Sequence, residues 1–581
     1  MPVSEKSGSN MKINFSKSIL IFLLPVLLLV SCTSTLTPKQ QAATLVIKNA
    51  NIYTVDAAFS KSAAIAVSGQ YLVYVGNNAG VEPFIGSDTE VLDLRDRTIL
   101  PGIIEGHMHL PMLGENLLNI NAYWKPRQAI LDAVAARVRE VAPGEWIQGF
   151  GWNNEVWEDK NYPTKAELDQ IAPDNPVVLT RTDGHMIWVN SRALELAGIT
   201  RKSQNPQGGE ILKDAVGNPT GCLTDTAMAP VLTLIPKLSK ARKKEALLKG
   251  QAHLLSLGIT SLVNAGTSVD DIENIKELYR QGKLKIRIYA LISSAWGKEL
   301  GDNEKMYFAR GPEVGLFDQH LTIRGIKLFA DGSLGSRSAA LFDDYNDRPG
   351  HRGNLVYSED ELYRLVKKAR TYKFQIATHA IGDAAVNQVL NVYERVLQEY
   401  PLPDHRYRIE HFQVATLEDI SRLAKLSVIA SMQATHATSD KNMAENRIGA
   451  TRMQGAYAWR TIIDSGAIIV NGSDAPVESA NPFDGLYAAV TRMDRDGRPE
   501  GGWYPNQRMT RTEALKSFTV WAAYGQFEEK LKGSLETGKL ADFIVIDRDY
   551  MQCPAAEIKD IKPLLTVIGG KILYRNPSLA N

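Results

Sequence analysis

The pattern of apolar and polar positions predicts short β-strands near the N-terminal end of the chain. Runs of β-type residues cover Leu45–Ile47, Asn51–Val55, Ala64–Val67 and Tyr71–Val75. The last two runs flank Ser68-Gly69, which is a two-residue hairpin signal.

The C-terminal end shows the same pattern. Ala541–Asp547 is a predicted strand, and Thr566–Ile568 is predicted to pair with Lys571–Tyr574 across Gly569-Gly570. We therefore expect residues 44–104 and 530–577 to build one small β-domain, with a larger domain inserted between them.

Between residues 105 and 529 predicted strands alternate with predicted helices, which is typical of a parallel α/β domain. One expected helix is Ala384–Gln398, with Asp383 as its N-cap. Residues 120–235 interrupt the alternation and hold five tryptophans, Trp124, Trp146, Trp152, Trp157 and Trp188. Such aromatic residues either pack in a core or line a substrate pocket.

The first residues predict an export signal. The apolar run Ile19–Val30 is too short to span a bilayer, follows basic residues and ends in Leu29-Val30-Ser31-Cys32. This resembles a bacterial lipoprotein signal (residues 1–31), which implies a lipidated Cys32, a tether at 32–43 and a main folded domain outside the cytoplasm. Thr33 after the cysteine favours the outer membrane by the same resemblance. An ordinary secretory signal is the alternative, and either Met1 or Met11 is the start.

Composition narrows the class of protein. The 581 residues exceed one compact core, and 66 basic against 65 acidic side chains give a net charge of +1. We therefore expect no nucleic-acid partner. Cys222 and Cys553 could pair outside the cytoplasm, although two free thiols are the simpler reading.

Candidate metal ligands follow predicted strands. His107 and His109 are two residues apart, so on a strand both imidazoles would face the same way, as a zinc site requires. His379, His411, His436 and Asp474 each follow a later strand. Since functional residues of a (β/α)8 barrel gather at the C-terminal ends of its strands, this joint pattern predicts one site.

Lys327 lies inside the predicted strand Leu321–Phe329, where a free cation is costly to bury. One interpretation is that it reaches solvent or pairs with Asp331. The other is that it is neutral and carries CO2 as a carbamate, whose carboxylate would bridge two metals.

Together these stretches resemble the amidohydrolase superfamily, and most closely amidohydrolase family 3. The resemblance covers nearly the whole chain after residue 44 and rests on residues 100–109, 178–191, 327–337, 379–383, 410–411, 472–476 and 533–542. It implies a distorted (β/α)8 TIM barrel beside a small β-sandwich built from both chain ends. Two departures are Glu105 and Asn153, where relatives often have Asp.

The resemblance also implies roles for individual residues. His107, His109 and Asp474 would hold one zinc ion, His379 and His411 a second, and carbamylated Lys327 would bridge them. Asp474 would also be the catalytic proton shuttle. Candidate substrate contacts are His185, Arg337, Trp152 and His436. Hydrogen bonds behind the ligating imidazoles are expected, but the sequence does not name them.

We therefore expect a metal-dependent hydrolase that cleaves a non-peptide C–N bond in a small amide, N-acyl or N-formyl compound. Hydrolysis of an ester or lactone is an alternative, since the same activated water attacks either carbonyl. A non-catalytic surface-binding lipoprotein is a second class, against which the complete ligand set argues. The expected partners are a small-molecule substrate and the membrane through the N-terminal lipid, and a homodimer is left open.

Overall fold

The computed structural model describes residues 42–579, except 124, 183, 185, 207–208 and 294–303. Residues 42–581 form one compact unit. The predicted signal and nearly all of the predicted tether, residues 1–41, lie outside the described residues. Within the described part of the chain, no helix combines the length and the apolar character needed to cross a bilayer.

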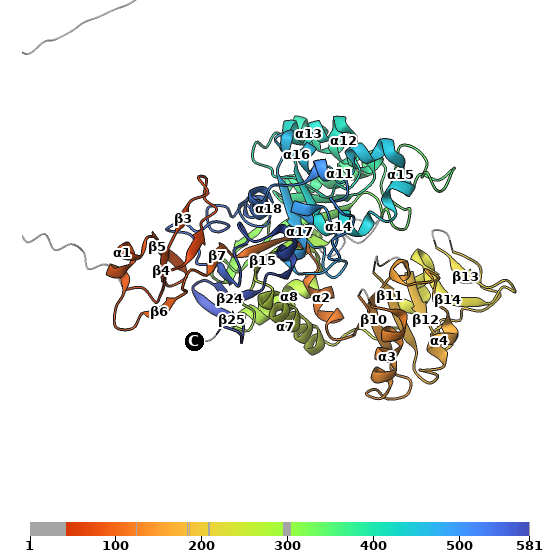
Figure 1. Ribbon diagram of the computed structural model, residues 1–581. Helices are drawn as coiled ribbons and strands as arrows, with labels where there is room; N and C mark the ends of the chain where they lie inside the picture. Colours follow the sequence, from red (N-terminus) through yellow and green to blue (C-terminus); the bar gives the residue numbers. More distant parts are fainter. Residues whose placement is uncertain are drawn as a thin grey trace, which may run out of the picture. The chain divides into compact units, whose positions relative to one another are not determined.

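Eight parallel strands form a nearly closed barrel at the centre of Figure 1. In order around the barrel they are β8 (Ile103–Met108), β15 (Ile259–Thr267), β16 (Arg287–Ser293), β18 (Leu321–Phe329), β19 (Gln375–Ala380), β20 (Arg408–His411), β21 (Ile429–Gln433) and β22 (Ile469–Gly472). Backbone hydrogen bonds link the exits of β22 and β8, from Asp474 N to His107 O and from His109 N to Ala475 O, both at 2.8 Å. The predicted barrel is therefore confirmed.

Glycine permits the close approach of the first and last strands at this junction. A Cβ atom on Gly106 would lie 2.4 Å from the carbonyl oxygen of Asn471. A larger residue at this position would push β8 away from β22, so glycine is needed where the barrel closes.

Helices surround the barrel, as Figure 1 shows for its upper half. They include α7 (Lys240–Ser256), α8 (Val269–Arg280), α11 (Glu359–Thr371), α12 (Asp383–Glu399), α13 (Leu417–Leu426), α16 (Trp459–Asp464), α18 (Arg511–Ser517) and α19 (Val520–Gly525). The N-cap of α12 is Gly382, so the prediction of Asp383 was one residue off. The Asp383 carboxylate instead accepts a hydrogen bond from Phe342 N in a neighbouring loop.

Two sheets form the β-sandwich. One contains β5 (Tyr71–Gly76), β4 (Ala64–Ser68), β1 (Leu45–Lys48) and β6 (Glu90–Asp93). The other contains β25 (Lys571–Arg575), β24 (Pro563–Ile568), β23 (Phe543–Ile546), β7 (Thr98–Pro101), β2 (Asn51–Tyr53) and β3 (Lys61–Ser62). Both predicted hairpins are present, and one hydrophobic core holds Leu45 and Val67 together with Phe543 and Val567. Both chain ends therefore build this domain.

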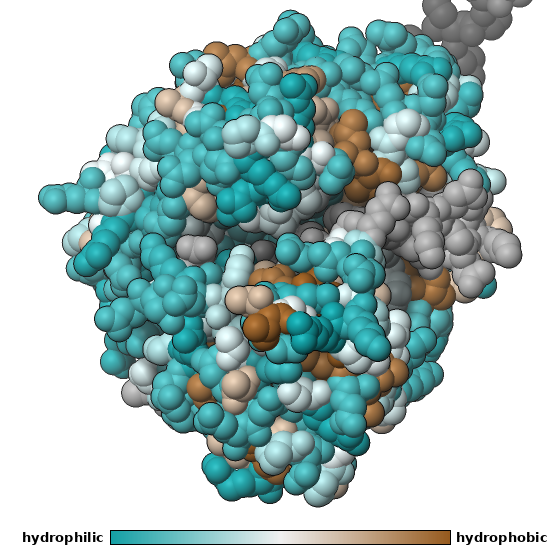
Figure 2. All heavy atoms as spheres, turned by 90° about the vertical axis from the view of Figure 1, so that its right-hand side faces the viewer, coloured by the Kyte–Doolittle hydropathy of each residue, from teal (hydrophilic) through white to brown (hydrophobic). Residues whose placement is uncertain are grey.

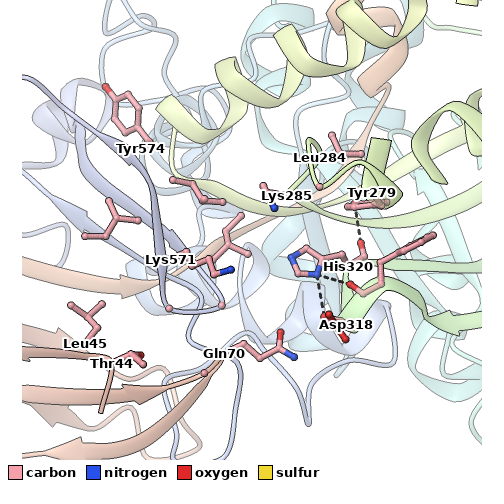
Figure 3. A pocket seen from close by; sticks show the side chains of 18 of the residues that line it. Thr44, Leu45, Gln70, Tyr279, Leu284, Lys285, Asp318, His320, Lys571 and Tyr574 are labelled. Atoms are coloured by element: carbon pink, nitrogen blue, oxygen red, sulfur yellow. Dashed lines mark hydrogen bonds between the residues drawn. The ribbon is translucent and has the colours of Figure 1, made fainter. Parts of the chain in front are cut away.

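A cavity of about 1040 Å³ lies between the sandwich and the barrel (Figure 3). Gln70 and Lys571 from the sandwich line it with Tyr279, Lys285 and His320 from the barrel. It lies where β16 and β18 begin, whereas catalytic residues of such barrels gather where the strands end. The cavity therefore belongs to the domain junction.

A buried ion pair joins the two domains beside this cavity. Arg287 at the start of β16 donates from Nε and Nη2 to Asp542 at 2.6 and 3.0 Å. Asp542 also accepts a hydrogen bond from Gly569 N in the β24–β25 turn. Because both side chains are at most 4% exposed, the pair fixes the barrel to the sandwich.

The region 120–235 forms its own sheet beside the barrel. Its order is β13 (Ile211–Lys213), β14 (Pro219–Thr224), β12 (Met186–Val189), β11 (Val177–Arg181), β10 (Ile147–Trp152) and β9 (Ile120–Asn121). Its helices are α3 (Arg127–Val138), α4 (Lys165–Asp169), α5 (Ser191–Leu196) and α6 (Ala229–Leu232). Trp152, Trp157 and Trp188 pack together in its core. Of the two interpretations of the tryptophans, packing in a core is correct for these three residues, rather than lining a substrate pocket. Cys222 in this region and Cys553 are free thiols.

Candidate metal centre

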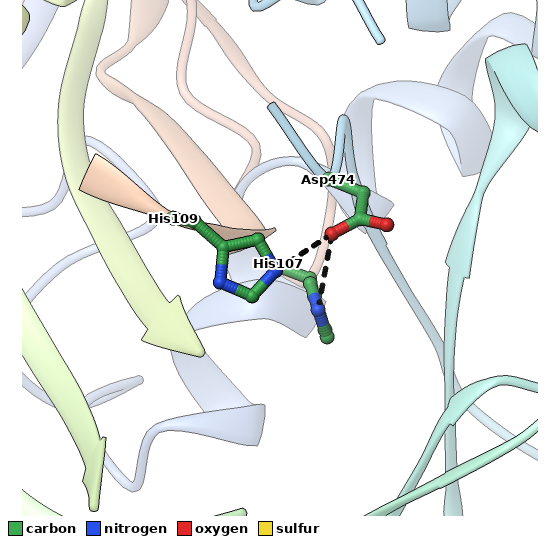
Figure 4. A group of neighbouring side chains, drawn as sticks. All are labelled: His107, His109 and Asp474. Carbon is green, nitrogen blue, oxygen red and sulfur yellow. Dashed lines mark ion pairs between the residues drawn. The ribbon is translucent and has the colours of Figure 1, made fainter. Parts of the chain in front are cut away.

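Three predicted ligands meet where the barrel closes. His107 lies on β8, His109 follows it, and Asp474 follows β22. Figure 4 shows both imidazoles directed at the Asp474 carboxylate. His109 Nε2 and His107 Nε2 lie 3.0 and 3.4 Å from Asp474 Oδ1. One ligand atom from each residue lies within 4.8 Å of the others, so these three could hold one metal ion.

The other predicted ligands border this group. His379 on β19 and His411 at the end of β20 have ring centroids 4.5 Å apart, and the His411 ring lies 4.9 Å from that of His107. Lys327 on β18 is 1% exposed, and its charge contributes to lowering the pKa of both His107 and His379. The structure therefore brings all six predicted ligands to the same end of the barrel.

Burial sets the protonation of these groups. It lowers the pKa of His107 to about 4 and of His379 to about 3, so both imidazoles are neutral at pH 7 and can bind a metal. Burial also lowers the pKa of Lys327 to about 8. For Asp474, burial alone would raise the pKa, but His109 and His107 hold it well below its ordinary value.

Hydrogen bonds orient two of the imidazoles from behind. His107 Nδ1 donates to the buried carboxylate of Glu410, which Arg408 also engages from Nε at 2.7 Å and Nη2 at 3.1 Å. His411 Nδ1 lies 2.8 Å from the Gln433 Oε1 acceptor. An acceptor at Nδ1 keeps the proton there and leaves the Nε2 lone pair for a metal.

Backbone strain marks the same end of the barrel. His411 has φ +75° and Asp474 has φ +58°, in the left-handed region that non-glycine residues rarely adopt. Strained residues persist where the surrounding structure holds them and cluster at functional sites. Here the strain falls on two of the candidate metal ligands.

The donor set fits a divalent metal. His107 Nε2 and Asp474 Oδ1 are buried and have no hydrogen-bond partner among the described residues. A buried polar atom without a partner is destabilising, and a cation between these atoms would satisfy both. Imidazole nitrogen and carboxylate oxygen are also the ligand types that zinc takes.

A cavity of about 480 Å³ opens above these ligands. His379, His411 and Asp474 line it together with Tyr123 and Asn153 of the inserted region. Figure 2 shows the face of the molecule where the inserted region meets the barrel, hollowed across its middle. The cavity has the size of a small-molecule site.

The predicted substrate contacts lie in different places. Arg337 lines the cavity and donates to Asp347 at 3.1 and 2.7 Å. His436 lines it too, with Nε2 3.9 Å from Asp474 Oδ2. Trp152 is fully buried in the core of the inserted region, where Nε1 donates to Leu179 O, so it packs there and does not line the cavity. His185 lies outside the described residues.

Asp331, named as a possible partner of Lys327, has a structural role in the fold. Its carboxylate accepts hydrogen bonds from the backbone nitrogens of Ala340, Ile381 and Gly382. It also lies 3.4 Å from His379 Nε2. Asp331 therefore fixes the loop that follows β19 close to the candidate ligands.

Sequence reasoning did not identify the residues behind the ligands. Arg408 and Glu410 alternate on β20, so both side chains face the same way, which is the one signal the sequence offered. Their partner His107 lies 303 residues earlier in the chain, so no local sequence pattern links the two positions. Only the closed barrel reveals the contact.

Comparisons with known proteins agree with this arrangement. Residues 90–574 match the amidohydrolase family. The amidohydrolase YtcJ of Bacillus subtilis is 33% identical over 535 residues, covering 90% of this chain and 98% of that protein. The N-substituted formamide deformylase of Arthrobacter pascens is 28% identical over 552 residues, covering 92% and 99%.

A solved structure extends the similarity to the whole fold. An uncharacterized metal-dependent hydrolase from Pyrococcus horikoshii has a TM-score of 0.71 and 28% identity, covering 88% of this chain and 99% of that one. Since the family match spans most of the chain, this chain belongs to the amidohydrolase family and is a metal-dependent hydrolase that acts on carbon–nitrogen bonds.

Proposed function

We propose that the enzyme hydrolyses a small amide, N-acyl or N-formyl compound in the cavity above the candidate ligands. The observation that carries this proposal is the group of six candidate ligands at one end of the barrel, three of which, His379, His411 and Asp474, line a cavity of about 480 Å³. The similarity to a protein named N-substituted formamide deformylase supports an N-formyl substrate.

We further propose that two zinc ions bind here. His107, His109 and Asp474 would hold one, His379 and His411 the other, with Lys327 between them as a carbamate. Lys327 supports this because a pKa of about 8 leaves part of the lysine neutral at pH 7, and the neutral amine is the form that adds to CO2 with loss of a proton. When bound, such metals supply Lewis acidity and lower the pKa of water.

The chain's own residues would move the proton. Asp474 is ionised at neutral pH, because the imidazoles of His109 and His107 beside its Oδ1 atom hold its pKa well below the ordinary value. It can therefore accept a proton from the attacking water and donate it to the leaving nitrogen. The walls of the cavity hold the substrate so that its carbonyl carbon lies near this carboxylate.

The test is a substrate panel with zinc-loaded protein. It contains N-formyl amines, N-acyl amines, and esters and lactones of matched size, with release of the acid and metal content measured together. We expect turnover of at least one amide class, abolished by a chelator and restored by zinc. Turnover of esters or lactones without any amide would contradict the proposal and favour the ester alternative.

We also propose that the protein is a lipoprotein anchored in the cell envelope, on the basis of Leu29-Val30-Ser31-Cys32 after the apolar run. Metabolic labelling with a fatty acid should mark the wild type but not Cys32→Ala. Absence of label on the wild type would contradict the anchor.

A further inference from the structure

His436, which also lines the cavity, differs from the candidate ligand histidines in what lies behind its ring. His107 and His411 each have an acceptor at Nδ1, the carboxylate of Glu410 and the Oε1 atom of Gln433. At His436 the neighbour of Nδ1 is the amide nitrogen of Gln413, at 2.9 Å. A donor in this position requires Nδ1 to accept, so the ring proton stays on Nε2.

The orientation of the Gln413 amide is itself determined by its neighbours. The same nitrogen lies 3.5 Å from Asp440 Oδ2, and an ionised carboxylate only accepts hydrogen bonds. Tyr457 donates its hydroxyl to that Asp440 oxygen at 2.7 Å. If the amide were turned over, its oxygen would face the Asp440 carboxylate, so the nitrogen must point toward both Asp440 and His436.

His436 lines the cavity, and its Nε2 then carries an N–H that no described residue accepts. The residue is 7% exposed, its ring stacks at 17° on His411, and Nε2 has no hydrogen-bond partner among the described residues. The nearest carboxylate oxygen, Asp474 Oδ2, is 3.9 Å away, which is too far for a hydrogen bond. A buried N–H without an acceptor is destabilising, so the geometry favours a ligand oxygen at this point.

We propose that His436 is a catalytic residue that donates its Nε2 hydrogen to the carbonyl oxygen of the substrate, and that Gln413, Asp440 and Tyr457 are positioning residues that hold it in this tautomer. The inference rests on the proposed amide hydrolysis. The bond strengthens as negative charge develops on that oxygen, so it stabilises the transition state more than the bound substrate. The site therefore requires a substrate with an sp² oxygen on the carbon under attack.

The first test changes His436 itself. In zinc-loaded enzyme, His436→Phe should lower kcat about 10²–10³-fold, the usual loss of one such donor, with little change in KM. His436→Gln keeps an N–H donor and should stay within about tenfold of wild type. Bound zinc should equal wild type in both. Loss of zinc from His436→Phe would instead show that His436 is a metal ligand and would overturn the proposal.

The second test changes only the tautomer. Gln413→Glu places an acceptor at Nδ1, moves the ring proton there and should lower kcat nearly as much as His436→Phe. Gln413→Met has a similar volume, cannot donate a hydrogen bond and is only a weak acceptor, so it does not draw the ring proton to Nδ1 and the loss should stay within about tenfold. Equal losses in the two Gln413 variants would show a packing effect and overturn the inference.

A binding measurement separates this inference from the reaction itself. A phosphonamidate analogue of the substrate carries the tetrahedral oxygen in stable form, and calorimetry should show weaker binding to His436→Phe and Gln413→Glu than to Gln413→Met. If the wild type hydrolyses no amide, the proposed function fails. If the wild type is active but all four variants match it in kcat and in binding, only the role of His436 fails.

Discussion

Substitution of Glu410 tests whether the hydrogen bond behind His107 fixes the tautomer that binds the metal. The Glu410 side chain is fully buried and accepts hydrogen bonds from His107 Nδ1 and from Arg408. Arg408 donates to both Glu410 oxygens, so in Glu410→Gln we expect the amide oxygen to keep the shorter contact, with Arg408 Nε at 2.7 Å, and the amide nitrogen to take the Oε2 position, which Arg408 Nη2 reaches at 3.1 Å. The amide nitrogen then faces His107, where it converts Nδ1 into an acceptor and leaves the proton on Nε2, the atom that should bind the metal.

Two magnitudes follow from this geometry. Loss of a hydrogen bond behind a ligating imidazole costs about 10–100-fold in metal affinity, or about 1.4–2.7 kcal/mol. Arg408 also stays buried without its carboxylate, which should lower the free energy of unfolding of the metal-free protein by about 3–5 kcal/mol. We expect both losses together in Glu410→Gln.

The matched control is Asp542→Asn, which breaks the buried pair with Arg287 where the barrel strands begin. It should lower the free energy of unfolding to a similar extent but leave zinc affinity unchanged. The measurements are competition with a chromophoric chelator for zinc, and urea unfolding of both metal-free variants. Wild-type zinc affinity in Glu410→Gln, alongside the expected destabilisation of Asp542→Asn, would refute the reasoning about the His107 tautomer.

Three further predictions concern the same site. Asp474→Asn should keep much of its metal but lose about 10²–10⁴ in kcat, more for an amide than for an activated ester, because only the amide nitrogen must be protonated to leave; near wild-type rates on both would exclude Asp474 as the proton shuttle. Lys327→Ala should bind both metals more weakly, and short-chain carboxylates should partly restore activity, whereas no rescue would count against the carbamate. The metal-free protein should lose stability as the pH falls below about 6.5, because the buried His107 and His379, with pKa values of about 4 and 3, stay neutral in the fold while the unfolded chain takes up protons; urea unfolding that is flat from pH 7 to 5 would contradict this.

Local signals in the sequence were sufficient for much of the fold. The Gly569-Gly570 turn has positive φ at both residues, as its hairpin requires, so strand pairing could be predicted there from neighbouring residues alone. The alternation of strands and helices likewise predicted a parallel α/β domain, and the resemblance to the amidohydrolase superfamily implied that it is a barrel. The predicted strand ends then indicated where the candidate ligands would gather.

Long-range contacts account for what the sequence did not reveal. The amide of Gln413 and the carboxylate of Glu410 acquire their roles from His436 and His107, residues on other elements of the fold. Trp152 could have lined a pocket or packed in a core, and only the sheet of the inserted region decides for packing. Asp383 was a reasonable N-cap, but its carboxylate instead accepts a hydrogen bond from the backbone nitrogen of Phe342, 41 residues earlier in the chain.

The shared β-sandwich has a consequence for how the chain folds during synthesis. β7 pairs with β23, which lies about 440 residues later in the chain. At ordinary translation speed, β23 is therefore synthesised on the order of a minute after β7. Until then β7 is an open edge carrying Ile99 and Leu100, the kind of surface on which nascent chains aggregate. A chain cut short before residue 543 would keep all eight barrel strands but lack β23, β24 and β25, so this edge of β7 would stay open.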